Sequence, residues 1–253
     1  MSEEMNAAEY AAENALRGLA RRAVCLTGAD IARLVREARQ EARRAKRSLA
    51  WTDLEERLSP SKLSKPESLR WRIAVHEAGH AVARRVLNLG SVTLITISGP
   101  HGDGMVVSEG TSPVAETEEH LSAMLMAMLA GRAAEEEILG TVGAGSGGGT
   151  SSDLGRATQL ALQMETSFGF GSATPLLHLD TQRRVDVLFY RADIAGRVNA
   201  RLETAYAAAR RLVKGRERLT RTLALELMRH DTLEGRDLDR LIGRSCNPNG
   251  ASA

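Results

Sequence analysis

Two histidines with a glutamate between them stand in an otherwise apolar run of the sequence. The run is RIAVHEAGHAVARRV, residues 72–86, and it places His76 and His80 four residues apart. In an α-helix such residues lie one turn apart on one face, so both imidazoles can reach the same metal ion. Glu77 lies about 100° further round the helix, where it is poorly placed as a ligand but can hold water beside the ion and take its proton.

The apolar surroundings favour a metal site over two histidines that merely fill a core. One stripe of the predicted helix contains Leu69, Ile73, His76, His80, Ala83 and Leu87. An imidazole buried there without a hydrogen bond or a metal would cost about 1–3 kcal/mol. Gly79 costs roughly 1 kcal/mol relative to alanine within a helix, which indicates that something packs closely against it. The pattern is the HExxH arrangement typical of zinc peptidases.

A zinc site of this kind requires a third protein ligand, with one position left for water. The metzincin pattern is excluded, because Ala83 and Val86 stand where it has a glycine and a third histidine. The remaining candidates are Asp153, Glu135 and Glu136, with His101 and His120 as weaker ones. Glu135 continues an apolar stripe, so it could be a ligand or could orient a histidine. Asp153 begins a helix after a glycine-rich loop, where simple N-capping is the ordinary role. Spacing alone leaves the choice open.

The amino-acid composition indicates the fold class and the cellular setting. Aromatic residues make up only 3% of the 253 residues, and the abundance of Ala, Leu, Arg and Glu favours a mainly helical fold. The net charge of +2 gives no overall attraction to nucleic acid or to an anionic membrane, and no apolar stretch approaches the roughly 18 residues of a membrane span. Cys25 and Cys246 suggest neither a disulfide framework nor a thiolate metal site, so we expect a reducing, cytoplasmic setting.

The order of elements follows from periodicity and from turn residues. We expect helices over about 27–49, 67–88, 113–139, from about 152 onward, and in three patterns over 181–243, with a β-hairpin or two neighbouring strands at 91–98 and 104–108. The segment SPSKLSKPES, residues 59–68, has the composition of a linker. These elements place the histidine pair within one long helix.

Three motifs in order carry a family resemblance. HEAGHA at 76–81, LAGRAAEEEILG at 129–140 and GTSSDLGRAT at 149–158 together resemble the peptidase domain of the FtsH family of ATP-dependent zinc metalloproteases. The resemblance continues at 205–213 and 231–242 and covers most of residues 69–243. It implies a Zn²⁺ site made by His76, His80 and Asp153, with Glu77 as the catalytic base.

The resemblance also predicts the domain organisation. Residues 1–58 look like the end of the helical lid of an AAA+ ATPase, followed by the linker at 59–68, a zinc-peptidase domain at 69–245 and a disordered tail at 246–253. Protein or peptide substrates, a possible AAA+ partner and a homohexamer are implied by resemblance. The 253 residues contain no GxxxxGK[ST] phosphate loop, so we expect no ATP hydrolysis by this chain itself.

The basic stretch at 14–50 holds ten Arg or Lys against three acids. We interpret it as the solvated face of the lid helix, with an electrostatic contact to a partner ATPase as the alternative, because no nucleic-acid-binding motif accompanies it. For the whole chain the alternative to an endopeptidase is a non-catalytic adaptor or assembly module that docks on a complete AAA+ ring.

Overall fold

The computed structural model describes most of the chain: residues 16, 19, 20 and 23, and residues 26–58, 65–99, 104–109, 116–180 and 186–244. The predicted tail at 246–253, most of the predicted linker and His101 lie outside these residues. The chain divides into two compact units. One takes residues 1–66 with 98–103, and the other takes residues 67–97 with 104–253.

The smaller unit contains a long helix packed against a short one. Helix α2 (Gly28–Arg44) contacts helix α3 (Trp51–Leu58). The hydroxyl of Thr27 accepts from the Asp30 N–H while the Asp30 carboxylate accepts from the Thr27 N–H, a capping box that begins α2. The helix predicted over 27–49 is therefore confirmed, although it ends at Arg44.

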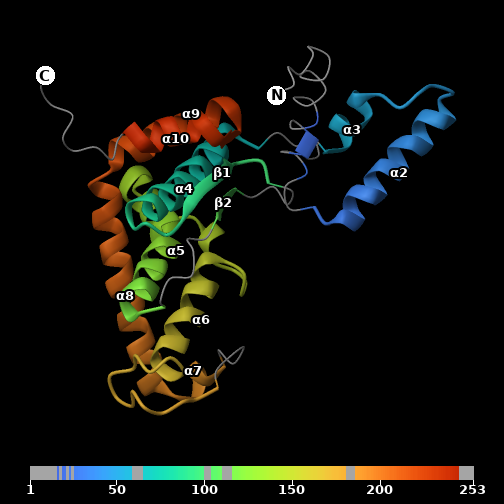
Figure 1. Cartoon of the computed structure of the whole chain (residues 1–253). Coiled ribbons are helices and arrows are strands. Elements are labelled where there is room, and N and C mark those ends of the chain that lie inside the picture. Colours follow the sequence, from blue (N-terminus) through green and yellow to red (C-terminus); the bar gives the residue numbers. More distant parts are fainter. Residues whose placement is uncertain are drawn as a thin grey trace, which may run out of the picture. The chain divides into compact units, whose positions relative to one another are not determined.

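The larger unit is built mainly from helices, as composition predicted. They are α4 (Glu67–Val86), α5 (Glu118–Leu139), α6 (Asp153–Thr166), α7 (Val187–Tyr190), α8 (Ala192–Lys214), α9 (Glu217–His230) and α10 (Gly235–Arg244), with a 3-10 turn η1 (Ala144–Ser146). Helix α5 packs against α4, α6, α8 and α9 (Figure 1). Gly140 ends α5 in the left-handed conformation with φ 71°, which glycine adopts without steric cost. No helix among the described residues has the length and hydrophobicity that crossing a membrane requires.

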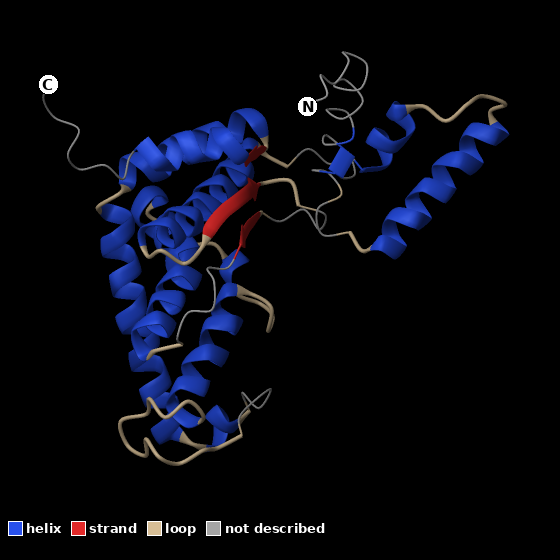
Figure 2. Ribbon diagram, in the orientation of Figure 1, coloured by secondary structure: helices blue, strands red, loops and turns tan. Residues whose placement is uncertain are grey.

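A small antiparallel sheet lies beside helix α4 (Figure 2). Strand β1 (Ser91–Thr96) is central, with β2 (Met105–Glu109) on one side and β3 (Thr232–Glu234) on the other. The predicted pairing of β1 with β2 is confirmed. Strand β3 was not predicted, because three residues are too short to show the alternation that identifies a strand.

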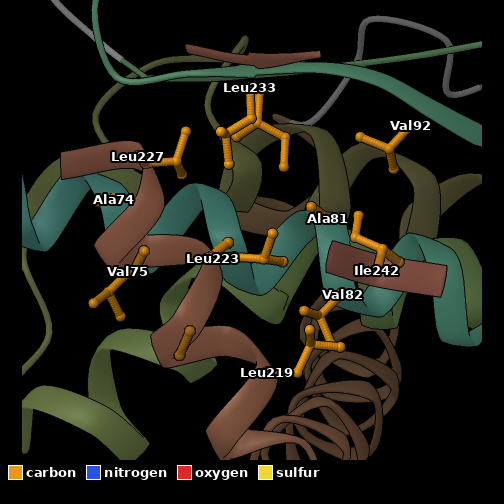
Figure 3. Close-up of a cluster of buried hydrophobic side chains, with 14 of the residues drawn as sticks. Ala74, Val75, Ala81, Val82, Val92, Leu219, Leu223, Leu227, Leu233 and Ile242 are labelled. Carbon is orange, nitrogen blue, oxygen red and sulfur yellow. The ribbon is translucent and has the colours of Figure 1, made fainter. Parts of the chain in front are cut away.

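Apolar packing fixes helix α4 in place. Figure 3 shows Val75 and Val82 of α4 among Leu223 and Leu227 of α9 and Leu233 of β3, all of them buried. Each such side chain contributes about 1.5–3 kcal/mol when it leaves water. The helix that carries both histidines is therefore held rigidly from the side of α9 and the sheet.

The buried face of α4 differs from the predicted stripe. The fully buried positions include Ala74, Val75, Ala78 and Val82, whereas Leu69 is 43% exposed. The prediction that Leu69 shares a buried stripe with the histidines is wrong at that end. The histidines lie on another side of the helix, which faces α5.

Candidate metal centre

The structure brings together two histidines from α4 and one aspartate from α6. Asp153 Oδ2 lies 3.0 Å from His76 Nε2 and 3.2 Å from His80 Nε2, and the two Nε2 atoms are 3.1 Å apart. We call these three residues the metal cradle. They are the only group of His, Cys, Asp and Glu side chains in the described part of the chain arranged to hold a metal ion. Each histidine side chain is 12% exposed, so the cradle is largely shielded from solvent.

Asp153 is free for the cradle because its neighbour caps the helix. The Ser152 hydroxyl accepts from the Gly155 N–H and so begins α6 in the N-cap role. Asp153 is then the first residue of the helix, and its carboxylate faces the histidines. Burial alone would raise the pKa of Asp153, but its hydrogen bonds to the two histidines hold that pKa well below its usual range.

Both imidazole rings are oriented through their Nδ1 atoms. His80 Nδ1 lies 2.8 Å from the Ala127 carbonyl oxygen, and His76 Nδ1 lies 2.8 Å from Glu135 Oε1. A carbonyl oxygen and a carboxylate only accept, so we assign the proton of each ring to Nδ1. Each Nε2 of a neutral ring then presents a lone pair to the cradle.

Three acceptor atoms face one another in the cradle as a result. Two Nε2 lone pairs and a carboxylate oxygen within 3.0–3.2 Å repel unless a cation or an additional proton lies among them. Two imidazole nitrogens and a carboxylate oxygen are ligands that Zn²⁺ binds, so the residues fit this ion. The surroundings also favour a positive charge here: burial opposes it, but the hydrogen bonds with Asp153 and Glu135 raise the pKa of His76 to about 10.

Glu135 holds His76 from behind. Its side chain is 3% exposed and accepts from His76, from Arg72 Nη1 at 2.5 Å and from the Gly143 N–H at 2.7 Å. Burial would raise the pKa of Glu135, but these donors, His76 first, lower it to about 2. Glu135 therefore lies on the Nδ1 side of the ring, where it orients His76 instead of sharing the Nε2 side with Asp153.

Glycines let helix α5 approach the cradle. A Cβ at Gly131 would lie 2.5 Å from His80 Nε2 and 2.6 Å from His76 Nε2, so any side chain there would fill the space that a metal needs. A Cβ at Gly79 would lie 2.6 Å from the Ala130 carbonyl oxygen. The close neighbour that Gly79 predicted is therefore the backbone of α5.

Glu77 lies beside the cradle under strand β2. The residue is 7% exposed, and a Cβ at Gly104, the residue before β2, would overlap its carboxylate. The Gly104 backbone thus covers Glu77 directly. The charge of Glu77 also contributes to the raised pKa of His76.

Other predicted candidates lie elsewhere. The Glu136 carboxylate accepts from the Tyr206 hydroxyl and lies 3.1 Å from Arg210, both on α8. His120 lies in the first turn of α5 and is not part of the cradle. Among the described candidates, only Asp153 meets the two Nε2 atoms.

Sequence reasoning did not single out Arg72 or Gly131. Arg72 stands four residues before His76, a spacing that places both on one side of the helix and could have suggested a partner for a buried carboxylate. Gly131 interrupts a run of strong helix formers, the same signal that was recognised at Gly79.

An HExxH helix whose histidines meet a carboxylate from a distant helix, on a mainly helical scaffold, defines a metallopeptidase class of domain. Residues 64–241 match the model of Peptidase family M41, and the chain belongs to that family. The predicted resemblance is therefore confirmed, and membership of this family identifies the chain as a metalloprotease.

Relatives from several bacteria agree with the family. The chain is 34% identical over 241 residues to ATP-dependent zinc metalloprotease FtsH 1 of Symbiobacterium thermophilum, which covers 90% of this chain and 39% of the relative. It is 33% identical over 239 residues to FtsH 3 of Sphaerobacter thermophilus, and this alignment covers 90% of the chain and 48% of the relative. It is 30% identical over 263 residues to FtsH 1 of Sorangium cellulosum, and this alignment covers 90% of the chain and 40% of the relative. The chain thus spans less than half the length of these relatives.

Proposed function

We propose that this chain is a zinc-dependent endopeptidase in which His76, His80 and Asp153 hold the ion and Glu77 is the general base. The observation that carries the proposal is the meeting of three acceptor atoms within 3.0–3.2 Å. The zinc metalloproteases among its relatives support the choice of ion.

The proposed chemistry divides between the ion and the protein. Zn²⁺, when bound, supplies Lewis-acid chemistry that polarises the scissile carbonyl and acidifies water. Glu77 accepts a proton from the attacking water and passes it to the leaving amine. Glu135 and the Ala127 carbonyl keep the two rings in the tautomer that binds metal.

Strand β2 is a candidate for aligning the substrate. Among the described residues it pairs only with β1, so its other edge can add an extended peptide by main-chain hydrogen bonds. Gly104, the residue before this strand, lies directly against the Glu77 side chain, so a peptide along the strand would pass near the proposed base. Such binding would tolerate many sequences. Normal cleavage by a folded Val106→Pro variant would contradict this role.

The proposal extends to substrates and partners. The substrates would be unfolded proteins or proteins delivered by an AAA+ motor, and the chain would assemble as a homohexamer in the cytoplasm. The names of the relatives, which combine ATP dependence with proteolysis, support a motor partner.

Metal content and proteolysis of the purified chain test the proposal together. We expect one zinc per chain and hydrolysis of casein that stops with a zinc chelator and returns with added zinc. Addition of a complete AAA+ ring and ATP should change the rate without replacing the need for zinc. A folded, zinc-loaded chain that leaves casein intact under all these conditions would support the adaptor alternative.

A further inference from the structure

Arg84 is a partly buried cation on α4, the helix that carries both histidines. It lies on α4 one helical turn beyond His80, and its Nη2 donates to the Leu89 carbonyl oxygen at 3.2 Å. Its Nε is buried and has no hydrogen-bond partner. Within the described residues no carboxylate pairs with Arg84, so a buried donor and a positive charge are left uncompensated.

A second arginine lies on α6, the helix that contributes Asp153. Arg156 is exposed on α6, one turn beyond Asp153, and it too has no carboxylate partner in the described part of the chain. Burial, and then the charge of Arg156, lower the pKa of Arg84 below its usual value. Each arginine is therefore one helical turn from a cradle residue, and those two cradle residues, His80 and Asp153, lie 3.2 Å apart between the two helices.

Other arginines of the same unit show what is missing here. Arg72 pairs with Glu135 at 2.5 Å, and Arg201 pairs with Glu165 at 2.7 Å. In both cases the guanidinium is partly buried and a carboxylate accompanies it. A guanidinium pair matches a carboxylate in charge and in planar, two-donor geometry.

We propose that Arg84 and Arg156, the arginine pair, form a subsite that binds a carboxylate of the peptide substrate beside the scissile bond. The inference rests on the proposed endopeptidase function. Four residues of helix span about 6 Å, and one residue of extended peptide spans about 3.3 Å. The bound carboxylate would therefore lie about two residues from the bond that is cut. It can be the C-terminal carboxylate of the peptide or the side chain of Asp or Glu.

Matched peptides test the subsite and distinguish the two sources. A parent peptide has a C-terminal amide and only neutral residues; one set restores the free C-terminal carboxylate at different lengths, and another places Glu or Gln at each position near the cleavage site. Two quantities are measured on the full chain: kcat/KM for the zinc-loaded protein, and the Kd of each peptide for the Glu77→Gln variant by fluorescence anisotropy. We expect about a tenfold preference for a carboxylate at one position.

Variants assign the preference to the arginine pair. Arg156→Gln should abolish it, Arg84→Gln should do the same, and Arg156→Lys should retain part of it. Because Arg156 is exposed, its substitution should leave zinc content and Tm unchanged even if Arg84→Gln fails to fold. Arg218→Gln, at another exposed arginine on α9, is the matched control and should keep the full preference.

Each outcome decides the inference. Hydrolysis with equal use of carboxylate and neutral peptides overturns the subsite and leaves the endopeptidase function intact, as does a preference that Arg156→Gln does not change. An arginine-dependent preference in Kd without hydrolysis shows that the arginine pair binds a peptide carboxylate, but it overturns the endopeptidase function and with it the position beside a scissile bond. Absence of both hydrolysis and preference overturns both.

Discussion

Two neighbouring glutamates on helix α5 belong to two different regions of the molecule. On the face toward α4, Glu135 accepts from His76 Nδ1 at 2.8 Å. On the face toward α8, Glu136 accepts from the Tyr206 hydroxyl and pairs with Arg210 at 3.1 Å. We call these the cradle face and the α8 face of the helix. Both glutamates were candidates from sequence, and only one of them reaches a histidine.

The difference lies in the partners and in the exposure. The Glu135 side chain is 3% exposed and fully engaged by His76, Arg72 and the Gly143 N–H, whereas the Glu136 side chain is 33% exposed. A buried carboxylate on an imidazole Nδ1 sets which ring nitrogen can bind metal. The partly exposed carboxylate of Glu136, between the Tyr206 hydroxyl and the Arg210 guanidinium, connects α5 to α8. We therefore expect substitutions on the cradle face to change metal binding and substitutions on the α8 face to change stability.

The largest effect should come from a substitution of Glu77, which lies beside the cradle. Glu77→Gln removes the proposed base but no metal ligand, so we expect peptide hydrolysis to fall by about 10²–10⁴-fold while zinc stays bound. Casein hydrolysis and zinc content of the same preparation measure both. Wild-type turnover in this variant would refute the assigned role.

The next effect concerns the third ligand. Asp153→Ala removes the carboxylate that meets both Nε2 atoms, so we expect the variant to lose most of its zinc during dialysis. Zinc per chain, with far-ultraviolet circular dichroism as the control for folding, measures this. If Asp153→Ala keeps its zinc and Glu135→Ala empties the site, Asp153 is the wrong third ligand.

A direct comparison of the two faces uses adjacent substitutions. Glu135→Gln should weaken zinc binding by about 10–100-fold, because His76 loses a charged partner on Nδ1. Glu136→Gln, the same change one residue later on the α8 face, should leave the zinc Kd unchanged. Competition with a chelator of known affinity measures both values. Equal losses in the two variants would remove the distinction between the faces.

The α8 face should respond in stability alone. Tyr206→Phe deletes the hydrogen bond to Glu136, and we expect a loss of about 1 kcal/mol in the free energy of unfolding with no change in zinc affinity. Urea denaturation measures the first quantity. Tyr190→Phe is the control, because Tyr190 is 83% exposed and should give no loss.

The smallest effect is a shift in alkaline titration. Burial, and then the hydrogen bond with Glu136, raise the pKa of Tyr206 to about 12. The folded protein keeps this proton where the unfolded chain, with a tyrosine pKa of about 10, has lost it. The resulting stabilisation is complete below about pH 10 and is lost as the pH rises through about 12. Tyrosinate absorbance should show a late-ionising tyrosine that is missing in Tyr206→Phe; identical curves would contradict the shift.

Much of the fold could be predicted because its signals are local. Helical periodicity and the caps at Thr27 and Ser152 depend on residues within a few positions of one another. Strand β3 and the exposure of Leu69 could not be predicted in this way, because each is decided by what another segment places against it.

The sequence by itself determined the chemistry of the site. His76, Glu77 and His80 lie within five residues of one helix, and helical geometry alone sets which of them share a face. The tertiary structure decided which carboxylate meets them. Asp153 is 77 residues from His76, and its approach depends on how α6 packs against α5, on the Ser152 cap and on the space at Gly131. Spacing along a chain carries no information about such distant contacts, so Asp153, Glu135 and Glu136 become distinguishable only when the helices are packed.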